Sequence, residues 1–206
     1  MLLHDAQWDG YLTMGPREEL REIIASQSLL TREEGYILAS GKRSPYYFDL
    51  KLTTLSSPRA LFLAARLILD KINALPAPVD AIGGLTSGAD PLVIAVSQLA
   101  MREGRILPAL FVRDEQKAHG TQRVIEGTVR DGMKVVILDD VITTGNSVLK
   151  AIQPVEKKGA QVVHVFILVD REEGGIELLR EQHYNVDPLF TYSELRSCGA
   201  VPRSSS

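Results

Sequence analysis

The stretch that most constrains the fold is a run of four apolar residues at 135–138, which leads directly into two adjacent aspartates, Asp139 and Asp140. An unbroken apolar run is typical of a strand that is buried on both faces of a sheet. Three more short apolar segments, at 79–85, 106–112 and 161–170, are also predicted to be strands. A sheet buried on both faces needs helices on each side, so an α/β fold is predicted.

Helical patterns separate these strands. Ser57 followed by Pro58 marks the start of one helix, and Asp90 followed by Pro91 predicts a second helix with Asp90 as its cap. Further helices are predicted at 146–159, where Pro154 indicates a bend or an early stop, and at 174–184. The alternation predicts a central, mostly parallel sheet flanked by helices, with ligands bound at the carboxyl ends of the strands.

The N-terminal part has a different pattern. Residues 16–30 are predicted to form an amphipathic helix, and residues 35–51 two β-rich runs around a Ser-Gly turn signal, which indicate a hairpin. No repeat or Pro/Gly/Ser-rich linker divides the chain, so one domain over 1–206 is expected. Within it, a hood would occupy about 1–55, and the tail at about 202–206 is expected to be disordered.

Composition excludes several classes of function. The net charge of −3 gives no overall basic field for nucleic acid. No apolar run approaches the roughly 20 residues of a membrane span, and the N-terminus does not have the pattern of a secretory signal. The single cysteine, Cys198, cannot form an internal disulfide, which favours a reducing compartment. A cytoplasmic protein without a membrane or nucleic-acid partner is therefore expected.

The segment Thr-Thr-Gly-Asn-Ser at 143–147 lies between a predicted strand and a predicted helix. Gly145 permits a tight turn, and amides at a helix start bind phosphate well. Thr143, Thr144 and Ser147 add hydroxyl donors. An ordinary helix cap would have similar residues, so the segment alone leaves both interpretations open. The sequence has neither a G-x-x-x-x-G-K-[ST] loop nor a G-x-G-x-x-G dinucleotide motif.

The two aspartates favour a ligand. A molecule that carries both a phosphate and a sugar diol would use both parts of the segment, because the amides would bind the phosphate and the carboxylates would accept hydrogen bonds from the hydroxyls. The carboxylates would also stabilise positive charge that develops on the sugar carbon. Asp139 and Asp140 are therefore predicted to act on the sugar of a phosphorylated ligand.

The thirteen residues 135–147 resemble the phosphoribosyl pyrophosphate signature of the type I phosphoribosyltransferases. Other segments are similar to those of the orotate phosphoribosyltransferases within that family. They are the S-G-x-x-S-P-x-Y segment at 40–47, the pyrophosphate-side loop at 84–92, the mobile catalytic loop at 112–127 and the V-D-R-E-E-G-G segment at 169–175. The resemblance extends over about residues 16–195 and implies a type I phosphoribosyltransferase-like α/β fold.

The resemblance also implies an activity, the transfer of phosphoribose from phosphoribosyl pyrophosphate to orotate with Mg²⁺, and a homodimer. It assigns catalysis to Asp139, Asp140, Arg113, Lys117 and His119. It places phosphoribosyl pyrophosphate on these five and on Val141, Ile142, Thr143, Thr144, Gly145, Asn146 and Ser147. Orotate is expected at Thr143, Arg171, Tyr47 and Phe48, and Mg²⁺ is expected to bind through the substrate, with Asp139 and Asp140 as its protein contacts.

Two positions depart from the family pattern. Ala39 stands where some members have a lysine before the Ser-Gly pair, and Asp114 stands where some have a lysine after the loop arginine. Two alternatives therefore remain open. One is a phosphoribosyltransferase for another base, and the other is a regulator that binds the sugar phosphate without turnover, for which Asp114 is the main support.

Overall fold

The computed structural model describes residues 14–37, 43–114 and 124–198. Its central sheet has six strands in the order β5-β4-β3-β6-β7-β8, and every neighbouring pair is parallel except β4 and β5. The strands are β3 (Ala81–Leu85), β4 (Ala109–Val112), β5 (Ile125–Glu126), β6 (Lys134–Ile142), β7 (Gln161–Asp170) and β8 (Val186–Thr191). The predicted α/β fold with a mostly parallel sheet is confirmed.

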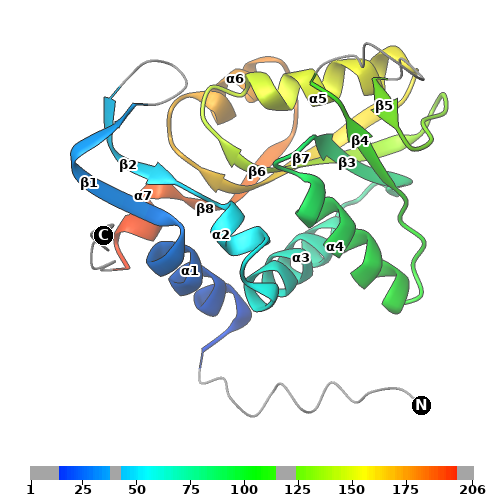
Figure 1. Cartoon of the computed structure of the whole chain (residues 1–206). Coiled ribbons are helices and arrows are strands. Elements are labelled where there is room, and N and C mark those ends of the chain that lie inside the picture. The colour runs from blue at the N-terminus through cyan, green and yellow to red at the C-terminus, as the bar shows by residue number, and fades with distance from the viewer. Residues whose placement is uncertain (1–13, 38–42, 115–123, 199–206) are drawn as a thin grey trace, which may run out of the picture.

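Helices cover both faces of this sheet, with α3 and α4 below it and α5 and α6 above it in Figure 1. They are α3 (Pro58–Asn73), α4 (Asp90–Arg102), α5 (Asn146–Lys157) and α6 (Gly175–Glu181). Alternate residues of β6 point to opposite faces, so Val136 and Leu138 join one apolar core while Val135 and Ile137 join the other. The apolar run in β6 is therefore unbroken because both faces are buried.

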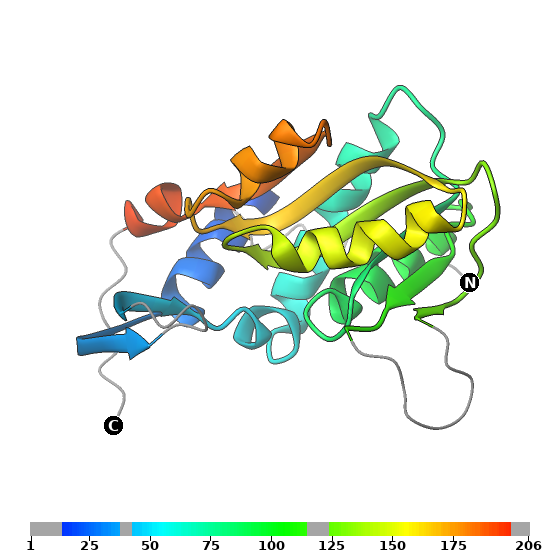
Figure 2. The same ribbon diagram turned by 90° about the horizontal axis from the view of Figure 1, so that it is seen from above.

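The hood is built from α1 (Pro16–Gln27), α2 (Lys51–Thr54) and an antiparallel hairpin of β1 (Leu29–Ile37) and β2 (Arg43–Phe48). Figure 2 shows the hairpin projecting at one end of the sheet. The short helix α7 (Tyr192–Arg196) follows β8 and packs against α1. The hood is therefore attached to the end of the last strand.

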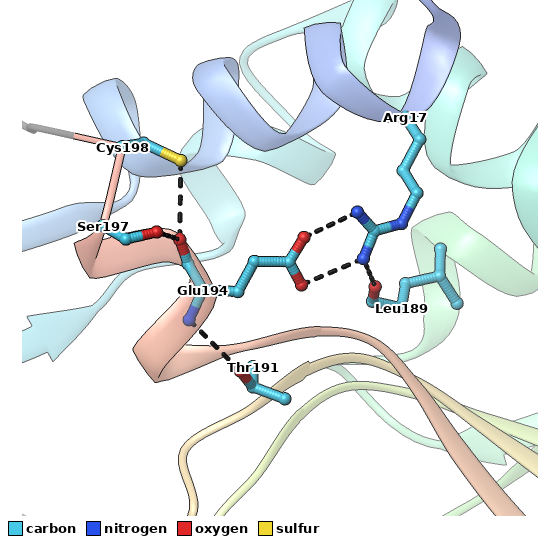
Figure 3. A network of polar contacts seen from close by, with 6 residues as sticks. All are labelled: Arg17, Leu189, Thr191, Glu194, Ser197 and Cys198. Atoms are coloured by element: carbon cyan, nitrogen blue, oxygen red, sulfur yellow. Dashed lines mark hydrogen bonds and ion pairs between the residues drawn. The ribbon is translucent and has the colours of Figure 1, made fainter.

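An ion pair joins the first and last helices (Figure 3). The two terminal nitrogens of Arg17 donate to the two carboxylate oxygens of Glu194 at 2.6 and 2.9 Å, and Nη2 also donates to the Leu189 carbonyl at 2.9 Å. Glu194 is itself fixed, because its backbone N–H donates to the Thr191 hydroxyl at 3.2 Å and its carbonyl accepts from Cys198 Sγ at 3.5 Å. The free thiol of Cys198 thus lies at this junction.

Several predicted boundaries were wrong. The first helix ends at Gln27, and the chain enters β1 at Leu29. Asp90 is not a cap: it is already the first residue of α4, and its side chain caps no amide. Pro154 does not stop α5, which continues to Lys157, because Ile152 and Val155 bury its apolar face.

Ser57, in contrast, caps α3 as predicted, by accepting from the Ala60 N–H. The tail predicted to be disordered, at about 202–206, lies outside the described residues. In the part of the chain that the structure describes, no helix is long and apolar enough to cross a membrane.

Candidate active site

The loop after β6 has the geometry of a phosphate site. Gly145 adopts a left-handed conformation, with φ +82°, and a side chain there would lie 3.0 Å from the Gly175 carbonyl. No described side chain caps α5, so the amides of its first turn are open to a ligand at the positive end of the helix dipole. Thr144, Asn146 and Ser147 are exposed beside these amides. An ordinary side-chain cap is therefore not what this segment forms.

The two aspartates at the end of β6 are buried. Asp139 is 6% exposed and Asp140 is 9% exposed. Each carboxylate accepts a hydrogen bond from the next backbone N–H, from Asp140 N at 3.0 Å and from Val141 N at 2.9 Å. Neither has a cationic partner in an ion pair within the described residues, so the pair presents concentrated negative charge beside the phosphate loop.

Burial raises the pKa of both carboxyl groups. For Asp139 the main cause is loss of hydration, and the negative charge of Asp140 raises the pKa further, well above its ordinary value. For Asp140 loss of hydration also dominates, while the hydrogen bond from Val141 and the positive charge of Lys51 oppose it. Lys51, at the start of α2, is therefore near enough to Asp140 to act on its charge, and sequence reasoning missed this neighbour of the aspartates.

The loop between β3 and α4 lies directly against the aspartates. A Cβ added at Gly88 would lie only 2.7 Å from Asp140 Oδ1 and 3.5 Å from Asp139 Oδ1. The preceding peptide bond, between Thr86 and Ser87, is cis. The sequence predicted that this loop would belong to the site, and the close approach explains why residue 88 is a glycine.

Arg171 follows β7 next to the phosphate loop, and its backbone N–H donates to the Ile142 carbonyl at 3.1 Å. The residue is only 5% exposed, and its Nη2 lies 2.8 Å from Glu173 Oε1. Its guanidinium carbon lies 5.2 Å from the centre of the Tyr46 ring. That ring stacks on Tyr192 with centroids 3.8 Å apart.

The aromatic residue that faces Arg171 is Tyr46, which sequence reasoning missed. Successive side chains of β2 alternate between faces, so Phe48 lies with Tyr46 but is 4% exposed within the core. Tyr47 points the other way, is 42% exposed and packs against Tyr36. The rings of Tyr47 and Phe48 therefore offer no flat surface next to Arg171, and the predicted role of these residues is left to their backbone groups.

The start of the predicted catalytic loop lies near the same edge of the sheet. Arg113 donates from Nε and Nη2 to Glu126 Oε1 at 2.9 and 2.6 Å. Asp114 accepts from Lys150 Nζ of α5 at 2.6 Å. Lys117 and His119 lie outside the described residues. The structure thus brings Arg113 to the edge that carries the aspartates and the phosphate loop.

A divalent cation fits the oxygen-rich edge. The described residues contain no group of three or more histidine, cysteine, aspartate and glutamate side chains that could hold a metal by itself. Mg²⁺, however, is usually bound by one or two carboxylates together with substrate phosphates. Asp139 and Asp140 could supply such carboxylates, although their hydrogen bonds to backbone amides already use one oxygen of each.

Together these groups place two carboxylates, open helix amides and a buried arginine at the carboxyl ends of parallel strands, where α/β proteins bind ligands. Comparison with known proteins identifies the class of protein to which the chain belongs. The family model described as "Phosphoribosyl transferase domain" matches residues 53–187, which is most of the chain.

Individual relatives narrow the class. The chain is 38% identical to the orotate phosphoribosyltransferase of Aquifex aeolicus over 185 residues, which cover 89% of this chain and all of that protein. Among solved structures, orotate phosphoribosyltransferase of Mycobacterium tuberculosis in complex with Fe(III) dicitrate superposes with a TM-score of 0.75 at 35% identity, covering 88% of this chain and 99% of that one. The same enzyme in complex with phosphoribosyl pyrophosphate gives a TM-score of 0.72 at 31% identity, with the same coverage. The chain belongs to the orotate phosphoribosyltransferase family.

Proposed function

We propose that the protein transfers the phosphoribosyl group from phosphoribosyl pyrophosphate to orotate, which gives orotidine 5′-monophosphate and pyrophosphate in pyrimidine biosynthesis. The observation that carries the proposal is the pair of buried aspartates in the strand that leads into an uncapped phosphate loop, with the buried Arg171 beside the end of that strand. The structure of the M. tuberculosis relative is a complex with phosphoribosyl pyrophosphate, which supports this choice of donor.

In this reaction N1 of the orotate anion forms a bond to C1 of the ribose, and the bond from C1 to the pyrophosphate oxygen breaks. The pyrophosphate leaves with the electron pair, so positive charge develops on the sugar. The carboxylates of Asp139 and Asp140 accept hydrogen bonds from the ribose hydroxyls and stabilise that charge. The new bond to C1 replaces the N1–H bond of orotate, and the proton passes to the departing pyrophosphate or to water.

The remaining groups orient the two substrates. The amides at the start of α5, with Thr143, Thr144 and Ser147, bind the 5′-phosphate. Arg113, together with Lys117 and His119, binds the pyrophosphate as negative charge builds up on it. Arg171 binds the carboxylate of orotate because a planar guanidinium matches a carboxylate. Mg²⁺, held by the substrate and by Asp139 and Asp140, would neutralise the pyrophosphate charge. A cytoplasmic homodimer remains part of the proposal.

The main support for the alternative of a regulator that binds without turnover was Asp114, which reverses a charge in the catalytic loop. Its carboxylate is paired with Lys150, so the reversed charge is balanced by a residue of the fixed body of the protein. A transferase for another base remains the competing reading, and the segment around Arg171 argues against it.

The test is the ultraviolet absorbance of orotate with phosphoribosyl pyrophosphate, Mg²⁺ and the protein. We expect a Mg²⁺-dependent change that Asp140→Asn abolishes, while Asp131→Asn, an exposed aspartate on a distant turn, retains it. Turnover with another base but not with orotate would refute the assignment of Arg171. Binding of phosphoribosyl pyrophosphate without turnover of any base would support the alternative that the protein is a regulator.

A further inference from the structure

The buried guanidinium of Arg171 has donors that the protein does not use. In the described part of the chain its Nε and Nη2 are shielded from solvent and make no hydrogen bond. Glu173 Oε1 lies 2.8 Å from Nη2, but this ion-pair contact lacks hydrogen-bond geometry. A buried charged donor without a hydrogen bond destabilises the folded protein. Arg171 is therefore only partly satisfied by the carboxylate next to it.

The guanidinium is held in place by groups other than Glu173. The Arg171 backbone is bonded to Ile142, and its guanidinium carbon lies over the Tyr46 ring at 5.2 Å. Tyr192 supports the other side of that ring, with the two ring planes only 15° apart. Removal of Glu173 from the guanidinium would therefore leave the arginine in the same position.

Glu173, in contrast, accepts no hydrogen bond within the described residues and has Arg171 as its ion-pair partner. Its side chain is 29% exposed, and it is followed by Gly174, which has φ +92° and open space around it. The adjacent Glu172 behaves differently, because its Oε2 accepts from the backbone N–H and the hydroxyl of Ser193 at 2.8 and 2.6 Å. Of two neighbouring glutamates, one is hydrogen-bonded to α7 and the other contacts Arg171 without a hydrogen bond.

We propose that Glu173 is an internal substitute for the substrate carboxylate, which occupies Arg171 in the free protein and is displaced when orotate binds. This inference rests on the function proposed above. An anionic substrate can replace Glu173, because it brings a carboxylate of its own and can satisfy the unused donors. A neutral pyrimidine such as uracil cannot, so Glu173 would also act as a specificity residue that rejects bases without a carboxylate.

The experiment compares Glu173→Gln with the matched control Glu172→Gln in full-length protein. Loss of the competing charge should lower the KM for orotate by about two- to fivefold, the effect of a partly exposed ion pair. The kcat and the KM for phosphoribosyl pyrophosphate should stay within roughly twofold of wild type. Glu172→Gln retains an acceptor for Ser193 and should leave all three values unchanged.

Thermal unfolding supplies a second readout. Without orotate, Glu173→Gln should melt below the wild type, because Arg171 loses its counter-charge. Saturating orotate should then raise the melting temperature more in the variant than in the wild type, since it replaces a missing carboxylate instead of exchanging one. The wild type and Glu172→Gln should show the same increase as each other.

The outcomes are distinct. A higher KM for orotate in Glu173→Gln would show that Glu173 positions Arg171 for the substrate. An unchanged KM would show that the carboxylates of Glu173 and orotate do not compete for Arg171. Either result overturns the inference. Absence of orotate turnover in the wild type would refute the proposed function instead.

Discussion

Gly88 approaches the two aspartates closely, so Gly88→Ala tests directly whether this loop fixes the position of Asp140. The added methyl carbon would lie 2.7 Å from Asp140 Oδ1 and 3.3 Å from its Cγ. A carbon atom in ordinary contact needs about 3.5 Å. The carboxylate or the loop must therefore move by roughly 0.8 Å. Gly88 is not among the residues with positive φ, so the effect is steric and adds no backbone strain.

A displacement approaching 1 Å at a reacting group costs up to about a hundredfold in rate. We therefore expect Gly88→Ala to lower kcat/KM for phosphoribosyl pyrophosphate by roughly ten- to a hundredfold. The global fold should survive, because the atom that is contacted is a side-chain oxygen. Gly84→Ala provides the contrast: its methyl carbon would lie 2.4 Å from the Leu138 carbonyl, a backbone atom of the sheet, and should lower the melting temperature strongly.

The assay is steady-state orotate turnover, with circular dichroism melting of both variants. Wild-type kcat/KM in Gly88→Ala would show that the loop does not fix the carboxylate, and the argument from the close approach would fail. A melting temperature that falls in Gly88→Ala as much as in Gly84→Ala would also contradict it.

Three further predictions concern charges. Burial raises the pKa of Asp139, so its charged form destabilises the folded protein increasingly as the pH rises from the ordinary pKa near 3.9 through the raised pKa. Asp139→Asn should therefore increase the melting temperature at pH 8 and leave it unchanged at pH 3.5. A decrease at pH 8 would contradict this. Arg17→Ala should lower the free energy of unfolding by about 0.5–1 kcal/mol in urea titrations, as the half-exposed pair with Glu194 is lost; no change would show that the junction contributes nothing. Asp114→Asn removes an exposed ion pair with Lys150 and should keep orotate turnover within about twofold of the wild-type rate. An inactive variant would show that Asp114 takes part in catalysis.

The sequence predicted the features that depend on local chemistry. The apolar run before Asp139 indicated a doubly buried strand, and Gly145 after it indicated a phosphate loop, because both signals lie within a few consecutive residues. The edge strand β8 gave no such signal, since Pro188 interrupts its pattern; proline is tolerated there because an edge strand has one unpaired side.

Features that depend on the relative position of distant segments could not be predicted. The choice of Tyr46 over Tyr47 as the neighbour of Arg171 follows from which face of β2 turns toward the sheet, and this is set by packing against Tyr192. The close approach of Gly88 to Asp140 likewise joins two strands that are remote in sequence.

The stack of Tyr46 on Tyr192 has a consequence for how the protein is made. The phosphate loop and the aspartates belong to segments that are complete once α5 has been synthesised, whereas the support for the Arg171 guanidinium needs the ring of Tyr192, which lies 35 positions after the end of α5. A growing chain therefore completes the loop proposed to hold the sugar phosphate well before it completes the support of Arg171, which is proposed to hold the base. Within the candidate site, the part proposed to distinguish one base from another is translated last.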